Sequence, residues 1–335
     1  MSYNEFVSAI EKLGLEKYRA DQVLDWVYKK HIFVFEKMTN LSIGHRQILA
    51  ESFSIDLPQI VDKRVSSIDK TTKYLYRLHD GNTIESVLLF HEGYATSCIS
   101  TQVGCPVKCS FCATGQSGFV RNLSTGEIVS QVLAIEDDSK QTIRNIVYMG
   151  MGEPLLNYDN VLKSVRILTH EKTKNVGIRR ITISTVGIPE KILRLSEEGL
   201  DLNLAISLHA ASDQKRDQII PMNKKYSIEE VLHAARMYQE KSDRRVTIEY
   251  ILIREFNDFD EDARRLAKLL KGMKVFVNLI PVNPVVSKME RPTQWKINRF
   301  KEILIESGVE AEIRYEKGAD IEAACGQLRI RNLQR

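Results

Sequence analysis

The sequence predicts an α/β protein built around a mostly parallel β-sheet. From residue 96 onward, short runs rich in β-branched residues alternate with longer segments of helical periodicity. This alternation is typical of βαβ units, in which each helix returns the chain so that successive strands run in the same direction. The chain has 335 residues, of which 43% are hydrophobic, and this is enough for one large domain with a sizeable core.

The first 55 residues predict short helices. Val23, Leu24, Trp26 and Val27 lie at helical spacing, and a second helix is expected around residues 43–53. We therefore expect residues 1–55 to form a small helical accessory domain that precedes the α/β domain.

Residues 56–95 predict a β-hairpin that links or extends the two domains. Residues 73–78 alternate between polar and apolar side chains, and 83–90 form a second run with strand character. Between them, Asp80-Gly81-Asn82 has the composition of a tight turn.

Residues 96–335 predict the α/β domain itself. Strands are expected near residues 96–102, 144–149, 179–184, 202–208, 245–253 and 274–280. Helices are expected near residues 125–137, 158–170, 189–198, 227–241, 258–271 and 293–307. Binding sites in parallel α/β folds lie at the carboxyl ends of the strands, so functional residues are expected where each strand ends.

The composition narrows the class of protein. No apolar run approaches the roughly 18 residues of a membrane-spanning helix, and the chain starts without a charged-then-apolar signal segment. We therefore expect a cytoplasmic protein with no membrane partner. The 48 basic and 44 acidic residues give a net charge of +4, which is too small to indicate nucleic-acid binding by itself. Local basic groups are solvated surface or RNA contacts: Lys172, Lys174, Arg179, Arg180, Lys224, Lys225, Arg329, Arg331 and Arg335.

Three of the five cysteines, Cys105, Cys109 and Cys112, form a CxxxCxxC run. Thiolates are the usual ligands of iron–sulfur clusters, and a four-iron cluster normally takes four of them, so three would leave one iron open to a small molecule. The alternative is a structural zinc site completed by His91 or Cys98, although no second cysteine pair is present to close it. A disulfide scaffold is not expected from five cysteines in a reducing compartment.

Further motifs accompany this run along nearly the whole chain. They are GCPVKCSFCATG at 104–115, MGMGEPL at 149–155, STVG at 184–187, SLH at 207–209, NLIPVNP at 278–284 and DIEAACGQL at 320–328. Together they resemble the radical S-adenosylmethionine (SAM) enzymes that methylate adenine in ribosomal and transfer RNA. The resemblance implies an open, partial (β/α)₆ barrel with a small N-terminal helical domain.

The resemblance also implies two cofactors, a 4Fe–4S cluster on Cys105, Cys109 and Cys112, and SAM chelated to the open iron. Glu153 is interpreted as a carboxylate that accepts a hydrogen bond from the SAM ammonium group. From the residues alone, such positions also suit turns and helix caps, and His209 also suits a satisfied core histidine. The expected cofactor-binding residues are Gly152, Glu153, Ser184, Ser207, Leu208, His209 and Asn283.

The same family implies three catalytic residues, Glu85, Cys98 and Cys325. Cys325 is methylated by a first SAM, and the 5′-deoxyadenosyl radical from a second SAM then removes a hydrogen from that methyl group. The resulting methylene radical adds to an adenine ring carbon, and the Cys98 thiolate releases the RNA by forming a disulfide with Cys325. Glu85 matches the proton acceptor. Without the resemblance, Cys325 suits a small buried hydrophobe, and Cys98 suits a core residue or a fourth ligand.

The implied function is methylation of adenine carbon 2 in 23S rRNA and tRNA. The alternatives are carbon-8 methylation of the same rRNA adenine, or a zinc-stabilised RNA-binding protein without catalysis. Pro154 in the MGMGEP motif favours carbon 2.

The expected partners are RNA, a one-electron donor such as flavodoxin and a thiol reductant, and the protein is expected to be a monomer. Phe119, Arg121, Arg179 and Arg180 are candidate RNA contacts, and residues 285–292 lack the glycine-containing loop common in the family.

Overall fold

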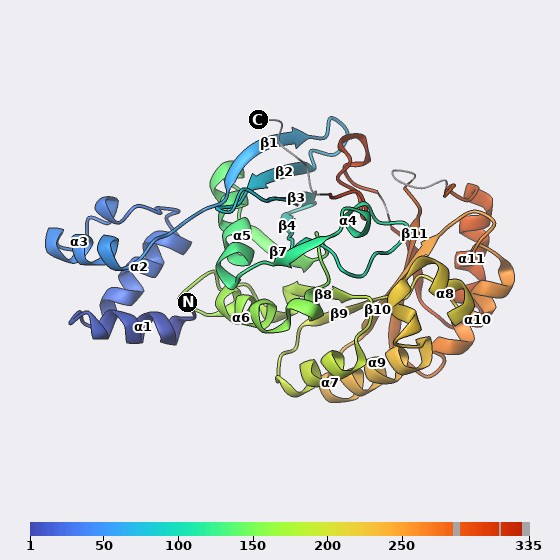
Figure 1. The fold of residues 1–335 in the computed structure, drawn as a ribbon. Helices are drawn as coiled ribbons and strands as arrows, with labels where there is room; N and C mark the ends of the chain where they lie inside the picture. The colour runs from blue at the N-terminus through green and yellow to red at the C-terminus, as the bar shows by residue number, and fades with distance from the viewer. Residues whose placement is uncertain (284–288, 315, 330–335) are drawn as a thin grey trace.

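The computed structural model describes residues 1–283, 289–314 and 316–329 (Figure 1). Pro284, the loop residues 285–288, and the tail residues Arg331 and Arg335, which the sequence analysis singled out, lie outside these ranges. The strands are β1 Gln59–Val65, β2 Thr72–Arg77, β3 Thr83–His91, β4 Tyr94–Cys98, β5 Gln102–Gly104, β6 Phe119–Asn122, β7 Ile143–Tyr148, β8 Ile181–Thr185, β9 Asn203–Ser207, β10 Val246–Leu252, β11 Val275–Pro281 and β12 Ala311–Ile313.

Ten of these strands form one sheet in the order β1-β2-β3-β4-β7-β8-β9-β10-β11-β12. From β4 to β12 every neighbouring pair is parallel, whereas β1 to β4 are antiparallel. The six strands predicted for the α/β domain are all present as β4 and β7 to β11, so the predicted parallel (β/α) arrangement is confirmed. The sequence analysis missed β12, a short seventh parallel strand, and β1, which extends the antiparallel edge.

The first predicted strand, residues 96–102, is too long at its carboxyl end. β4 ends at Cys98, because the chain then leaves the large sheet and residues 102–104 pair as β5 with β6. This small second sheet carries the chain directly into the CxxxCxxC run.

Helices cover the outer side of the parallel strands (Figure 1). The helices are α1 Tyr3–Lys12, α2 Tyr18–Tyr28, α3 Ile43–Ser52, α4 Ala113–Gln116, α5 Thr125–Ser139, α6 Tyr158–Thr169, α7 Pro189–Glu197, α8 Asp213–Ile219, α9 Ile228–Ser242, α10 Asp260–Leu270 and α11 Gln294–Glu306. The 3₁₀ turns next to the site are η2 Pro154–Asn157 and η4 Pro221–Lys224. The six predicted helices of this domain appear within about two residues of their expected ends, which is the usual precision of helix boundaries.

Local sequence explains where several of these helices begin. In α5 the Ser124 side chain accepts the Glu127 N–H, and the Glu127 carboxylate in turn accepts the Ser124 N–H. The same reciprocal bonds join Ser227 and Glu230 at α9. Each pair satisfies backbone donors that have no partner within the helix, so both starts are fixed by sequence.

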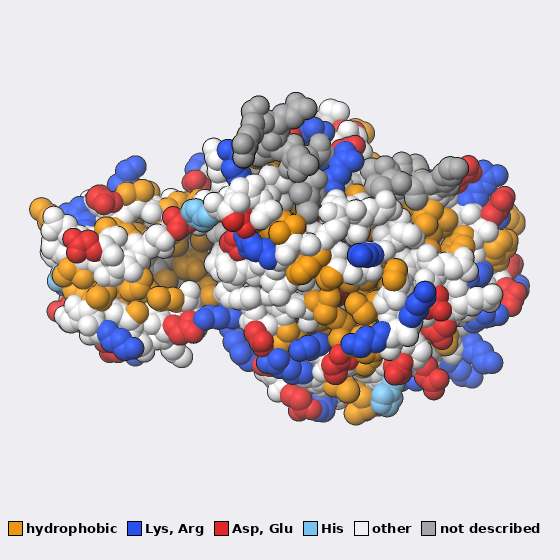
Figure 2. All heavy atoms as spheres, in the orientation of Figure 1, with side chains coloured by type: hydrophobic (Ala, Val, Ile, Leu, Met, Phe, Trp, Pro, Cys, Tyr) orange, Lys and Arg blue, Asp and Glu red, His pale blue; other side chains and the backbone are white. Residues whose placement is uncertain are grey.

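The three N-terminal helices form a lobe beside the sheet (Figure 2), and this lobe contacts α6 and the turn after it (Figure 1). The Tyr3 ring stacks on the His170 ring at 4.4 Å between centroids. The Lys163 ammonium lies 2.7 Å from the Glu5 carboxylate. In the described ranges no helix combines the length and apolar character needed to span a membrane.

Candidate active site at the carboxyl ends of the parallel strands

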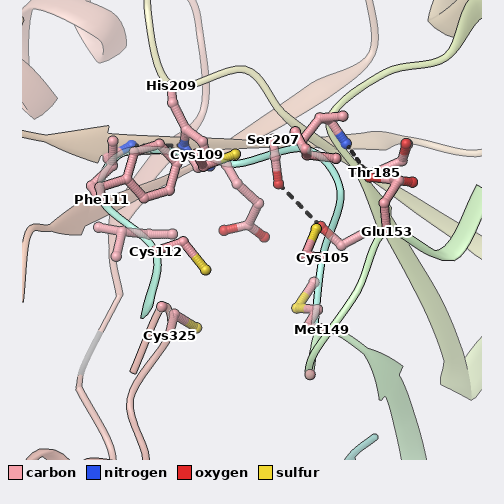
Figure 3. Close-up of a pocket in the computed structure, with 18 of the residues that line it drawn as sticks. Cys105, Cys109, Phe111, Cys112, Met149, Glu153, Thr185, Ser207, His209 and Cys325 are labelled. Carbon is pink, nitrogen blue, oxygen red and sulfur yellow. Dashed lines mark hydrogen bonds between the residues drawn. The ribbon is translucent and has the colours of Figure 1, made fainter. Parts of the chain in front are cut away.

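A cavity of about 960 Å³, part of it open to solvent, lies where β7 to β11 end. We call it the strand-end cavity. The sequence analysis expected ligands at this edge of the sheet, and most of them line it (Figure 3). The predicted residues on its wall are Cys105, Cys109, Cys112, Gly152, Glu153, Ser184, Ser207, His209, Asn283 and Cys325.

The cysteine loop is held in place by backbone hydrogen bonds on three sides. Cys105 N–H donates to the Gly118 carbonyl at 2.8 Å, and Ser110 N–H donates to the Ile219 carbonyl at 3.0 Å. Ala113 N–H donates to the Gly326 carbonyl at 2.8 Å. The entry to this loop requires glycine at 104, where φ is +76° and a Cβ would lie 1.9 Å from the Gly118 oxygen.

Cys105 and Cys109 are buried and Cys112 is half-buried, in an environment that opposes thiolate formation. Burial raises the pKa of Cys105 to about 12 and raises that of Cys109 well above its usual value. Neighbouring thiols add to the rise, whereas the Arg216 guanidinium lowers the pKa of Cys109. A cationic metal group would therefore supply the charge that three thiolates need here.

The donor set fits a cluster better than a single zinc ion. Within the described residues, no three Cys, His, Asp or Glu side chains converge as ligands of one metal ion. A four-iron cluster binds each thiolate to a different iron, so its ligands need not meet at one point. His91 and Cys98, the proposed completing zinc ligands, line a different cavity from Cys105 and Cys109.

The MGMGEP motif forms the turn after β7. Gly152 has φ +105°, and a Cβ there would lie 2.7 Å from the Gln102 Cβ. Glu153 is buried, and its carboxylate accepts the N–H of Leu155 at 3.0 Å and that of Val186 at 2.9 Å. Burial raises the pKa of Glu153 to about 7, against the effect of these donors. The site thus holds a carboxylate whose charge has no cation paired with it among the described residues.

Polar groups from successive strands surround the cavity. The hydroxyls of Ser184 in β8 and Ser207 in β9 lie 3.3 Å apart. His209 Nδ1 accepts the Ile251 N–H at 3.0 Å, and burial lowers the pKa of His209 to about 3. The ring is therefore neutral, and its proton is on Nε2. His209 is thus a satisfied buried histidine that also lines the cavity, with its ring edge-on to Phe111 (Figure 3).

Leu208 differs from the other predicted cofactor residues, because its fully buried side chain does not line the cavity. Its carbonyl instead accepts a hydrogen bond from Arg216 Nε at 2.9 Å. The sequence analysis missed Arg216, a buried residue of α8. Its guanidinium also donates to the Val186 and Ser207 carbonyls, so it ties together the ends of β8 and β9.

A second cavity of about 1260 Å³ adjoins the first. We call it the thiol cavity, because Cys98 and Cys325 both line it. The residues that line both cavities are Cys112, Met149, Gly150, Ile280, Asn283, Arg314, Cys325 and Gly326. Cys325 and Cys112 therefore lie at the boundary between the two cavities, whereas Cys98 lines the thiol cavity alone.

The disulfide expected between Cys98 and Cys325 is not formed, since both residues are free cysteines in this structure. Burial raises the pKa of Cys98 to about 12, whereas the Arg314 guanidinium lowers it. Arg314 follows β12, lines both cavities and lies 3.7 Å from the Glu249 carboxylate. No sequence motif drew attention to Arg314.

The loop that carries Cys325 is anchored at both ends. Gly318 and Gly326 have φ of +67° and +81°. Thr114 Oγ1 donates to the Leu328 carbonyl at 2.5 Å, and Lys73 Nζ donates to the Glu322 carbonyl at 2.9 Å. Cys325 itself remains exposed between these anchors.

Glu85, the predicted proton acceptor, lies in β3 beside this loop and does not line either cavity. It is fully buried, and its carboxylate accepts the Arg329 N–H at 2.9 Å and lies 3.6 Å from Lys73 Nζ. In this conformation Glu85 holds the Cys325 loop, and the structure brings it to the loop rather than to the cavity wall.

The candidate RNA contacts have different surroundings. Arg121 pairs with Asp80 at 2.6 Å and with Glu127 at 2.8 Å, so its guanidinium already forms ion pairs within the chain. Phe119 is 45% exposed. Arg179 is exposed and lies 3.9 Å from Asp201.

Comparisons with known proteins agree with this geometry. Residues 99–270 match the model of the radical SAM superfamily, and residues 1–55 match that of the ribosomal RNA large subunit methyltransferase N-terminal domain. A "Probable dual-specificity RNA methyltransferase RlmN" from Pseudothermotoga lettingae is 79% identical, with 99% of this chain and 97% of the relative aligned. The protein of the same description from Thermotoga maritima is 63% identical, with 100% and 97% covered.

A solved structure shares the whole architecture. The crystal structure of a radical SAM methyltransferase from Sphaerobacter thermophilus superposes with a TM-score of 0.95 at 43% identity, covering 98% of each chain. With relatives this similar over their full length, the chain belongs to the RlmN family within the radical SAM superfamily.

Proposed function

We propose that this protein is a radical SAM RNA methyltransferase that places a methyl group on carbon 2 of adenine in 23S rRNA and tRNA. Family membership supports the reaction class and RNA as the substrate. A cytoplasmic monomer that uses a one-electron donor such as flavodoxin and a thiol reductant is part of the same proposal.

The strand-end cavity is the proposed cofactor site. Cys105, Cys109 and Cys112 would hold a 4Fe–4S cluster, and Glu153 would pair with the ammonium group of SAM. Ser184, Ser207 and Asn283, with the backbone at Gly152, Leu208 and His209, would supply the remaining polar contacts. When bound, the cluster and SAM supply the methyl group and the radical chemistry that a side chain alone cannot provide.

The position of Cys325 is the observation that best supports a relay through a protein thiol. Because its loop lines both cavities, the same sulfur can accept a methyl group on the cofactor side and contact a base on the Cys98 side. Cys98, as a thiolate, would then attack the Cys325 sulfur. Before this step the adduct would give its ring proton to the general base and one electron back to the cluster. A new S–S bond would then form as the S–CH2 bond breaks, the electron pair of that bond would go to the methylene carbon, and this carbon would take up a proton to become the methyl group. The reductant later restores both thiols.

Glu85 is the proposed acceptor of the ring proton. It is a buried carboxylate next to the Cys325 loop, with a bond to Arg329 N–H that must break before it can contact the base. Proton acceptance would therefore require the loop to move away from β3, which links this step to opening of the loop.

Analysis of the modified nucleoside tests the proposal. Reconstituted protein would be incubated anaerobically with SAM, dithionite and transcripts of 23S rRNA fragments or tRNA, and digested RNA compared with authentic 2-methyladenosine and 8-methyladenosine by mass spectrometry. We expect 2-methyladenosine, and none with the Cys325→Ala variant. Exclusive formation of 8-methyladenosine would establish the carbon-8 alternative instead.

A further inference from the structure

A hollow on the outer side of the cysteine loop has no part in the mechanism above. It has a volume of about 760 Å³, much of it open to solvent, and we call it the lysine hollow. Its wall comes from two segments, the cysteine loop and η4. Its lining includes Val107, Lys108, Met222, Lys224 and Lys225.

The lysine hollow and the strand-end cavity are separated by a thin wall. Val107 lines both of them, and it lies between the proposed cluster ligands Cys105 and Cys109 in sequence. The hydrogen bond from Ser110 N–H to the Ile219 carbonyl, 3.0 Å long, fixes the cysteine loop to the end of α8 just before η4. Figure 1 shows α8 and the loop before α4 on the same side of the barrel. The hollow is therefore a place where a partner could approach the cluster site across one residue.

The described residues that line the hollow include three lysines and no acidic residue. Lys108, Lys224 and Lys225 are all exposed, and none of them lies within ion-pair distance of an acidic side chain in the part of the chain that the structure describes. Lys225 Nζ lies 4.7 Å from the centroid of the Tyr226 ring, and the nearby Glu190 already accepts the Tyr226 hydroxyl. Such unpaired cations attract and orient an acidic partner.

We propose that the lysine hollow is the docking site of a small acidic one-electron carrier protein. The inference rests on the proposed function, because an electron carrier would dock here only if a redox-active cluster lies behind Val107. On transfer the reduced carrier loses one electron and the cluster gains one, and no proton or group needs to move.

RNA is a less suitable occupant of this surface. The substrate base must reach Cys98 and Cys325, and the thiol cavity that they line shares no lining residue with the lysine hollow. A carrier in the hollow and RNA at the thiol cavity would therefore not compete for the same residues.

A charge-reversal variant tests the docking site. Lys224→Glu/Lys225→Glu would be compared with Lys268→Glu/Lys271→Glu, which makes the same charge change at exposed positions in and after α10. Binding of a purified bacterial flavodoxin and of a bacterial ferredoxin to the reconstituted holoenzyme would be measured by calorimetry at low and high salt. Stopped-flow absorbance would follow cluster reduction by each reduced carrier and by dithionite.

We expect at least one carrier to bind the unmodified protein in a salt-sensitive manner. The Lys224/Lys225 variant should bind that carrier, and be reduced by it, about tenfold more weakly and slowly. The Lys268/Lys271 control should behave as the unmodified protein, and all three should react equally with dithionite. These results support the docking site.

Three outcomes would overturn it. One is that neither carrier binds, and another is that the two double variants bind equally well. The third is that the Lys224/Lys225 variant loses RNA binding while its reduction by the carrier is unchanged, which would assign the hollow to RNA. Failure of the unmodified protein to methylate RNA with dithionite concerns the proposed function instead, and it is measured without any carrier.

Discussion

The two adjoining cavities are built in different ways. The strand-end cavity takes its side chains from the ends of consecutive parallel strands and from the cysteine loop, which backbone hydrogen bonds hold at Gly118, Ile219 and Gly326. The thiol cavity lies between the antiparallel strands β3 and β4 and the loop that carries Cys325. The strand ends form most of the first cavity, whereas the loop that carries Cys325 touches the first cavity at Cys325 and Gly326 and forms much of the wall of the second.

This difference suits the strand-end cavity to cofactor binding and the thiol cavity to transfer of the methyl group. Rigid strands suit the placement of a cofactor, because small displacements of the reacting atoms lower the rate strongly. A loop suits a sulfur that must meet several groups in turn. Substitutions in each cavity test whether the two have the separate roles that their construction indicates.

The largest expected effect is in the strand-end cavity. Replacing Cys109 with Ala removes one of the three proposed thiolate ligands, and the loop has no spare cysteine to take its place, so iron loading should be lost. Absorbance near 400 nm and iron analysis after anaerobic reconstitution measure this. Cys98→Ala, in the thiol cavity, is the matched control and should load iron normally. Equal loading of both variants would remove the basis for separating the two cavities.

The second prediction concerns the thiol cavity. Cys98→Ala should load the cluster and accept the methyl group on Cys325, since neither step uses the Cys98 sulfur. Turnover should then stall with RNA bound covalently through Cys325. A slowly migrating protein band that RNase removes is the expected observation, and the double variant with Cys325→Ala should lack it. Normal methylation by Cys98→Ala would contradict the proposed release step.

The sequence predicted the strand-end cavity more completely than the thiol cavity, for a physical reason. A parallel sheet gathers its strand ends on one edge, so motifs such as those at Glu153, Ser184 and Ser207 could be placed together from the order of strands. The thiol cavity depends on contacts between distant segments. Glu85 meets the backbone of Arg329 across the sheet, and no local pattern indicates that bond.

Two arginines of the site, Arg216 and Arg314, were not predicted by any sequence pattern. α8 was not predicted, because its sequence DQKRDQI has one apolar residue, and the side chains that it buries are Arg216 and Ile219. Helical periodicity is recognised from apolar side chains, so a short helix that buries a hydrogen-bonded arginine gives no signal. Arg314 follows a three-residue strand that was also missed, and only the folded chain shows that it lines the same cavity as Cys98 and Cys325.

The third prediction is a pH dependence in the strand-end cavity. If Glu153 pairs with the SAM ammonium group as proposed, its carboxylate must be ionised, and burial raises its pKa to about 7. In protein without the cluster, where no iron competes for the SAM amine, this amine stays protonated between pH 5 and 7, so ionisation of Glu153 should raise the affinity about tenfold per pH unit. Calorimetry across this range measures it. Glu153→Gln should bind about 2 kcal/mol more weakly at pH 7.5 and lose the pH dependence. A sloped profile in the variant would assign the titration to another group.

The last prediction concerns Arg314 in the thiol cavity, and its effect is the smallest. Burial raises the pKa of Cys98 to about 12, and the Arg314 guanidinium opposes this rise. Because the thiolate is the nucleophile, removing the cation raises the pKa further and lowers the reactive fraction at any pH below it. Arg314→Met should therefore slow alkylation of Cys98 by iodoacetamide by about tenfold at pH 8, one pKa unit being a factor of ten.

The pH profile distinguishes this electrostatic effect from a change in packing. Below its pKa the alkylation rate of Cys98 rises in proportion to the thiolate fraction, so the unmodified protein and Arg314→Met should give parallel lines displaced along the pH axis. Arg314→Lys keeps the charge and should restore most of the rate. Labelling is read by peptide mass spectrometry in cluster-loaded Cys325→Ser protein, so that Cys98 is the thiol followed. If the methionine variant changed the slope, or if lysine failed to rescue the rate, Arg314 would act by shaping the thiol cavity rather than by its charge.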